Sequence, residues 1–215
     1  MHPLLTSPLS PSGYTWTIAS RVSDALSQAE QQFGSRDPSY FYAGHEFIDG
    51  NPSTWYPGDR GHIVIQLGQQ CQTDFVRAIY QLSHEVIHLL APTGGQRANN
   101  LEEGLATWFS EEYCRRATGQ TLKAALPCYQ RASDLVQRML AHDSSCIKSM
   151  RQEEPFISRI TKPTFQRHCS CLSDDEVEFL LERFTRSTPS TRAVFDQQNQ
   201  TGDKPAHPTA DNAPV

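Results

Sequence analysis

The sequence contains no apolar run of about 18 residues, the length that a helix needs to cross a bilayer. Its first residues, MHPLLTSPLSPSGYTW, lack the basic and apolar stretches of a signal peptide. Lysine and arginine form no dense run, and the net charge is -5, so neither nucleic acid nor an anionic membrane is an expected partner. These absences predict a soluble cytoplasmic protein.

Internal repeats are also absent. A chain of 215 residues can bury about 70% of its unfolded surface and needs no disulfide framework. Without an export signal, we expect its six cysteines to stay reduced. They are Cys71, Cys114, Cys128, Cys146, Cys169 and Cys171.

The order of the periodic segments predicts an α+β fold with its strands ahead of most helices. We expect one domain at residues 14–186, a loose segment rich in proline and serine at 1–13, and a disordered polar tail at 187–215. Strands are expected at 39–48 and 62–67, and these can pair as an antiparallel ribbon. Helical patterns cover residues 16–34, 73–91, 100–116, 121–142, 144–152 and 173–185, the last with Ser173 and Glu176 at capping-box spacing.

Residues 81–90, QLSHEVIHLL, place His84 and His88 four positions apart within an apolar run. On a helix, the large apolar residues fall on one stripe and both imidazoles fall on the opposite side. Two such rings can reach one ion at about 2.0–2.1 Å, and Glu85 can reach a water on that ion. Two histidines on a solvated face are the alternative, but the full pattern and its apolar flanks favour a metal site.

The segment NNLEEGLATWFSEEY can supply a further ligand from the next helix. Its projection separates the large apolar residues from Glu103 and Thr107, which share the other face. The Thr107 hydroxyl can bond a metal ligand or simply cap the preceding turn.

The motifs HEVIH and EEGLA, within residues 60–116, resemble the gluzincin zinc metallopeptidases, the thermolysin-like type of zincin. The resemblance implies that His84 and His88 are zinc ligands, that Glu85 is the general base, and that Glu103 is the third ligand. Glu102 is the rival ligand, and its projection near the edge of the face makes it the poorer one. The metzincin branch is excluded because Ala91 and Gly94 stand where it needs glycine and histidine.

The implied fold is a zincin-like domain with a small antiparallel or mixed sheet, an HExxH helix, a glutamate helix and a helical C-terminal half. One Zn2+ per chain would act as a Lewis acid and lower the pKa of its bound water toward about 7. Glu85 would take the proton of that water and pass it to the leaving amine. The predicted activity is hydrolysis of a peptide or protein substrate, by an endopeptidase because no GAMEN-like motif precedes HEVIH.

Several alternatives stay open. A non-catalytic zinc-stabilised interaction module could use the same ligands, and a hydrolase of a small amide is a further possibility. The strand HIVIQL is either the edge strand that pairs with substrate or an ordinary core strand. The segment HCSC is either a second soft metal site or, as we prefer, a pair of exposed reduced thiols. The resemblance also implies a side chain that stabilises the oxyanion, for which the candidates are His168, our preference, and Tyr129, His142 and Tyr113.

Overall fold

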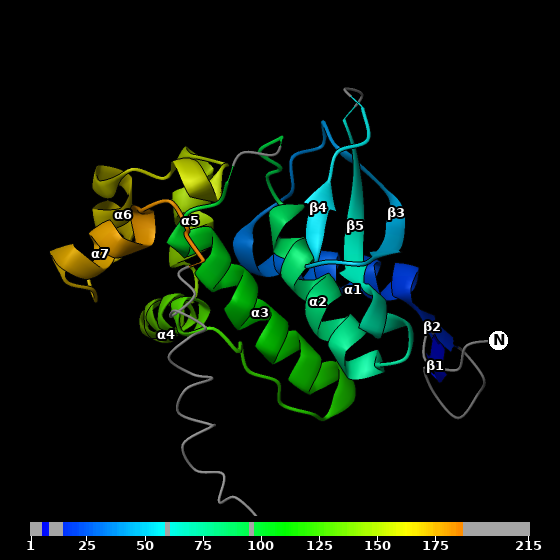
Figure 1. The fold of residues 1–215 in the computed structure, drawn as a ribbon. Coiled ribbons are helices and arrows are strands. Elements are labelled where there is room, and N and C mark those ends of the chain that lie inside the picture. Colours follow the sequence, from blue (N-terminus) through cyan, green and yellow to red (C-terminus); the bar gives the residue numbers. More distant parts are fainter. Residues whose placement is uncertain (1–5, 9–14, 59–60, 95–96, 187–215) are drawn as a thin grey trace, which may run out of the picture. The chain divides into compact units, whose positions relative to one another are not determined.

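The structure is a computed structural model, and it describes residues 6–8, 15–58, 61–94 and 97–186 (Figure 1). The chain divides into a compact unit, Met1–Thr185, and a second unit, Arg186–Val215. All elements below belong to the first unit. The tail expected at 187–215 lies outside the described residues, as does most of the segment expected to be loose at 1–13.

The described chain begins with a small ribbon and a long helix. Strand β1 (Thr6–Pro8) pairs antiparallel with β2 (Thr15–Thr17). Helix α1 (Ile18–Phe33) follows, and Thr17 and Ser20 cap its start reciprocally. It ends at Gly34, whose φ of 95° favours glycine. The helix expected here is confirmed.

Three strands form a mixed sheet in the order β3-β5-β4. Strand β3 (Phe41–Ile48) runs parallel to the central strand β5 (His62–Gly68), and the short β4 (Ser53–Trp55) pairs antiparallel with β5. The expected antiparallel pairing of β3 with β5 is therefore wrong. The segment between them contains its own strand, which reverses the chain once more and brings β5 back parallel to β3. The HIVIQL strand is central, so the edge strands are β3 and β4 rather than β5.

The rest of the unit is helical. Helices α2 (Phe75–His88) and α3 (Asn100–Thr118) lie side by side, and α4 (Pro127–His142) packs against α3 (Figure 1). Helix α4 begins later than predicted, at a proline suited to a first helical turn. The remaining elements are α5 (Cys146–Glu153), α6 (Lys162–His168), α7 (Asp174–Leu181) and the 3-10 helices η1 (Gln69–Gln72) and η2 (Ile157–Arg159).

Helix α3 lies in the middle of the packed helices. Leu101, Leu105 and Phe109 are fully buried, and polar Thr107 and Ser110 are buried as well. The helix is therefore enclosed by α2 on one side and α4 on the other, rather than being two-faced as its projection suggests. Within the described residues, no helix combines the length and the apolar character needed to cross a membrane.

Candidate metal centre

Helix α2 presents both histidines on one face. Its start is fixed by Asp74, whose side chain accepts the backbone N–H of Arg77. The opposite stripe, which includes Leu82 and Val86, is fully buried, and this sets the rotation of the helix about its axis. His84 and His88 therefore lie on neighbouring turns, with ring centroids 5.4 Å apart.

Helix α3 brings two glutamates to the same place in its first turn. Asn99 caps the helix by accepting the backbone N–H of Glu102. Glu102 and Glu103 then sit where the helix dipole favours negative charge. Because α2 and α3 pack closely, both carboxylates face the two imidazoles of α2.

The side chains of His84, His88 and Glu103 meet at one place. Glu103 Oε2 lies 3.2 Å from His84 Nε2, and Glu103 Oε1 lies 3.9 Å from His88 Nε2. Ligand atoms bound tetrahedrally at about 2.0–2.1 Å from zinc are roughly 3.3 Å apart, so these separations fit a shared ion after small adjustments. Among the described residues, this is the one group of three or more such side chains whose ligand atoms lie within 4.8 Å of one another.

Accessibility and donor type also fit a bound metal. The His84 and His88 side chains keep 13% of their surface exposed and that of Glu103 keeps 15%. The group is thus partly enclosed but open to a small molecule. Two imidazoles and one carboxylate are the donor set of open zinc sites.

Glu102 contacts the opposite side of the His88 ring. Its Oε1 lies 2.8 Å from His88 Nδ1, and the residue is only 5% exposed. Burial alone lowers the pKa of His88, but the Glu102 hydrogen bond and the charges of Glu103, Glu102 and Glu85 outweigh it and raise this pKa to about 10. The carboxylates around the His88 ring therefore favour positive charge there.

Glu85 is buried, with 4% of its surface exposed. It follows His84 directly in α2, and its charge acts on the His88 ring. That Glu85 reaches a water on the ion stays a prediction.

Tyr129 is the aromatic residue that the fold places beside His84. Their ring centroids are 5.9 Å apart in an edge-to-face arrangement, and Phe184 packs on the Tyr129 ring at 4.6 Å. Tyr129 lies in the first turn of α4, so its position depends on how closely α4 approaches α3.

The other oxyanion candidates lie in other surroundings. His168 Nε2 lies 2.6 Å from Glu153 Oε1, in a surface cluster that links α6 to α5. The Tyr113 hydroxyl donates to Asp24 at 2.7 Å inside the core, and His142 is exposed at the end of α4. Of the four candidates, Tyr129 is the one with a ring contact to a residue of the His84, His88 and Glu103 group.

The structure also bears on the Thr107 hydroxyl and on the HCSC segment. The Thr107 hydroxyl donates to the Glu103 backbone carbonyl at 2.8 Å, which is the cap-like alternative rather than a bond to the ligand carboxylate. In the HCSC segment, Cys169 is buried, Cys171 is partly exposed, and their sulfurs are 3.6 Å apart. They form no three-ligand metal group with any described residue.

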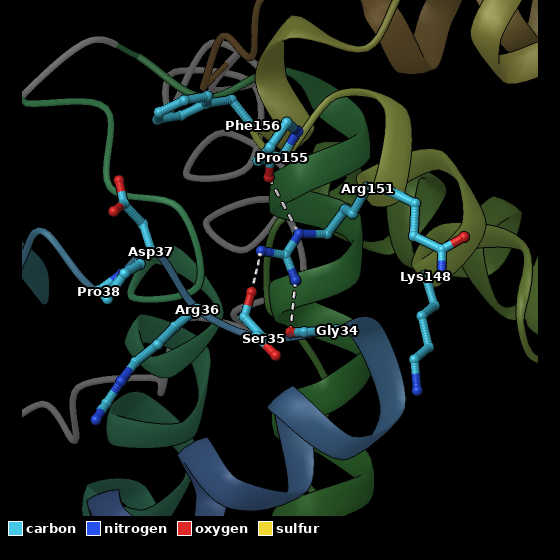
Figure 2. Close-up of a pocket in the computed structure, with 10 residues that line it drawn as sticks. Gly34, Ser35, Arg36, Asp37, Pro38, Lys148, Arg151, Pro155 and Phe156 are labelled. Atoms are coloured by element: carbon cyan, nitrogen blue, oxygen red, sulfur yellow. Dashed lines mark hydrogen bonds between the residues drawn. The ribbon is translucent and has the colours of Figure 1, made fainter.

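A cavity of about 560 Å³ lies elsewhere, between the end of α1 and α5 (Figure 2). Arg151 lines it and is 6% exposed. All five of its N–H groups are used, because the guanidinium donates to the backbone carbonyls of Phe33, Gly34, Ser35, Leu90 and Pro155. Arg151 therefore has no N–H left for a ligand and instead ties the chain together.

Comparisons of the chain with protein-family models, curated proteins and solved structures gave no match. The function is therefore inferred from the geometry of the site itself. Two of its features were missed by reasoning from the sequence, namely the bond from His88 to Glu102 and the placement of Tyr129. The two consecutive glutamates of EEGLA were a signal for the bond from His88 to Glu102. The placement of Tyr129 depends on the close contact of α3 with α4, and the only sequence signal for that contact was Gly104.

Proposed function

We propose that this chain is a zinc-dependent metallopeptidase of the gluzincin type. His84, His88 and Glu103 would hold the metal, and Glu85 would be the general base. The observation that carries the proposal is the convergence of two Nε2 atoms from α2 on one carboxylate from α3. A solvated pair of histidines would need no such partner from a second helix.

Each residue has a chemical role that suits its surroundings. Zinc held by two imidazoles and a carboxylate polarises a carbonyl group and lowers the pKa of a coordinated water toward about 7. Glu85, next to His84 and shielded from solvent, would accept a proton from the attacking water and deliver it to the leaving amine. Glu103 would supply the negative charge that anchors the cation between two neutral rings.

Tyr129 would assist by donating its hydroxyl proton in a hydrogen bond to the developing oxyanion. Its contact with the His84 ring supports this role. A peptide substrate would lie in an extended form along the edge strand β4, whose outer side pairs with no other strand among the described residues.

The test uses the full chain, measured for zinc content and for cleavage of a peptide library. We expect about one zinc per chain and internal cleavage of peptides. Glu85→Gln should keep the zinc and lose cleavage, because an amide cannot accept the proton. Glu112→Gln, on the exposed side of α3, is the matched control and should behave as wild type.

Other outcomes separate the alternatives. A protein that binds zinc without cleaving any peptide would support the zinc-stabilised interaction module. Absence of zinc binding would exclude both the zinc peptidase and the zinc-stabilised interaction module. Unchanged cleavage by Glu85→Gln would assign the activity to other residues.

A further inference from the structure

The two consecutive glutamates of α3 lie on different sides of one imidazole ring. Glu103 Oε1 is 3.9 Å from Nε2 of His88, while Glu102 Oε1 is 2.8 Å from Nδ1 of the same ring. An ionised carboxylate can only accept a hydrogen bond, so the Nδ1 atom of His88 must be the donor. In the neutral form of the ring, the form that can bind a metal, the Nε2 atom then carries the lone pair, and this atom faces Glu103.

We infer that Glu102 is the positioning residue of the metal centre. By accepting the Nδ1–H of His88, it fixes both the tautomer and the orientation of that ring, and so directs Nε2 toward the point shared with His84 and Glu103. The inference rests on the proposed function, since it assigns a role within the same zinc site. It also gives separate tasks to the two glutamates of EEGLA, one as ligand and one as support.

Glu102 is held firmly enough for this task. It is 5% exposed, and its own N–H is bound by the Asn99 side chain at 2.9 Å. The next anchor is Asn100, which bonds to Glu182 through its backbone and to Phe179 through its side chain. The first turn of α3 is thus fixed to α7, and Glu102 has little freedom to rotate away from His88.

The choice of a carboxylate at this position carries a cost. The Oε2 atom of Glu102 is buried and accepts no hydrogen bond from the described residues, and burying an incompletely paired charge is unfavourable. A glutamine could accept the Nδ1–H bond through its carbonyl oxygen without that charge. What the carboxylate adds is electrostatic, because an anionic acceptor makes the opposite nitrogen of the ring a stronger metal ligand.

The rival explanation is a buried ion pair between Glu102 and protonated His88 that merely joins α2 to α3. Such a pair would affect folding but would not favour metal at Nε2. Affinity for metal and the site of metal attachment therefore separate the two explanations.

The experiment measures zinc affinity of the full chain by competition with a chromophoric chelator. We expect Glu102→Gln to fold and to keep one zinc per chain, with an affinity lower by about 10–100-fold. Glu112→Gln serves as control and should keep wild-type affinity. Urea unfolding of the zinc-free proteins identifies any variant that is not folded.

A second measurement remains decisive even if Glu102→Gln folds poorly. Two-bond 1H–15N correlation spectra of the zinc-loaded wild-type protein should show His88 protonated at Nδ1 and bound to metal through Nε2. Metal on Nδ1 of His88 would overturn the inference, as would an unchanged zinc affinity in a folded Glu102→Gln variant. Complete loss of zinc in that variant would make Glu102 a ligand and also overturn it. If wild type binds no zinc, the proposed function itself fails.

Discussion

A β-carbon placed on Gly104 would lie 2.6 Å from the carbonyl oxygen of Ala132. Helices α3 and α4 therefore meet backbone against backbone, at the residue that follows Glu103. The same contact holds the first turn of α4, with Tyr129, against the His84 ring. Glycine is needed here for close approach, since the obstacle is a helix backbone rather than a flexible side chain.

Gly104→Ala should therefore separate α3 from α4. Overpacking costs up to about 3 kcal/mol, and the better helix propensity of alanine returns about 1 kcal/mol, so we expect a net loss of about 2 kcal/mol of unfolding free energy. Urea denaturation measures this loss. Gly50→Ala is the control, because a β-carbon at Gly50 meets nothing nearer than 3.6 Å. Equal stability of the two variants would contradict the tight contact.

Glu103→Ala should lose zinc while the fold persists. The change removes the anionic member of the group, which lies near both Nε2 atoms. Removal of a residue that supports a metal ligand lowers metal affinity by about 10–100-fold. We expect the loss of zinc affinity in Glu103→Ala to be larger than that. Zinc titration of the variant measures it, and Glu112→Gln again provides the comparison. Tight zinc binding by Glu103→Ala would place the metal elsewhere.

Zinc should also stabilise the folded protein. A ligand that binds only the native state adds about 2.7 kcal/mol when present at 100 times its Kd. We expect the melting temperature to rise with zinc concentration and to fall on addition of a chelator. Glu103→Ala should show almost no response. A wild-type melting curve that is insensitive to zinc would argue against a specific site.

Tyr129→Phe and His168→Ala should differ in their effect on catalysis. Removal of one oxyanion donor costs about 10²–10³ in kcat, and we expect that loss for Tyr129→Phe with zinc content unchanged. His168→Ala should keep wild-type kcat, since its ring is bound to Glu153. Steady-state kinetics on one peptide substrate decides between them. The reverse result would restore His168 as the catalytic residue.

Acid should weaken the link between α5 and α6. Hydrogen bonds from Arg167 and His168 lower the pKa of Glu153 from 4.5 to about 2. Because the folded-state pKa is depressed, the stabilisation is present above pH 4.5 and is lost as pH falls toward 2. Glu153→Gln should thus be slightly less stable than wild type at pH 7, with the difference vanishing near pH 2. Asp134→Asn, a surface substitution on α4, is the control for the urea series.

Local signals predicted much of this fold. The capping pair Ser173 and Glu176 forms as its spacing indicates, and Asp74 begins α2. The four-residue spacing of His84 and His88 was enough to place both rings on one face, because a helix period is a local property. That these rings bind zinc stays a prediction.

Features that depend on residues far apart in the sequence could not be predicted from the sequence. The pairing of β3 with β5 was misjudged because the three-residue β4 has too little pattern to be recognised between turn residues. Helix α6 was missed since seven residues give barely two turns of periodicity. Nothing in the polar segment around Arg151 indicates that its side chain is buried.

The five carbonyl groups that accept from Arg151 have a consequence for how the protein opens. They belong to the end of α1, the chain just after α2, and the loop after α5. Helix ends usually fray on their own, but these ends can loosen only when one buried guanidinium gives up bonds to several segments at once. Their amide protons should exchange in one cooperative step. The end of α2, the helix that carries His88, is therefore tied to a helix more than sixty residues further along the chain.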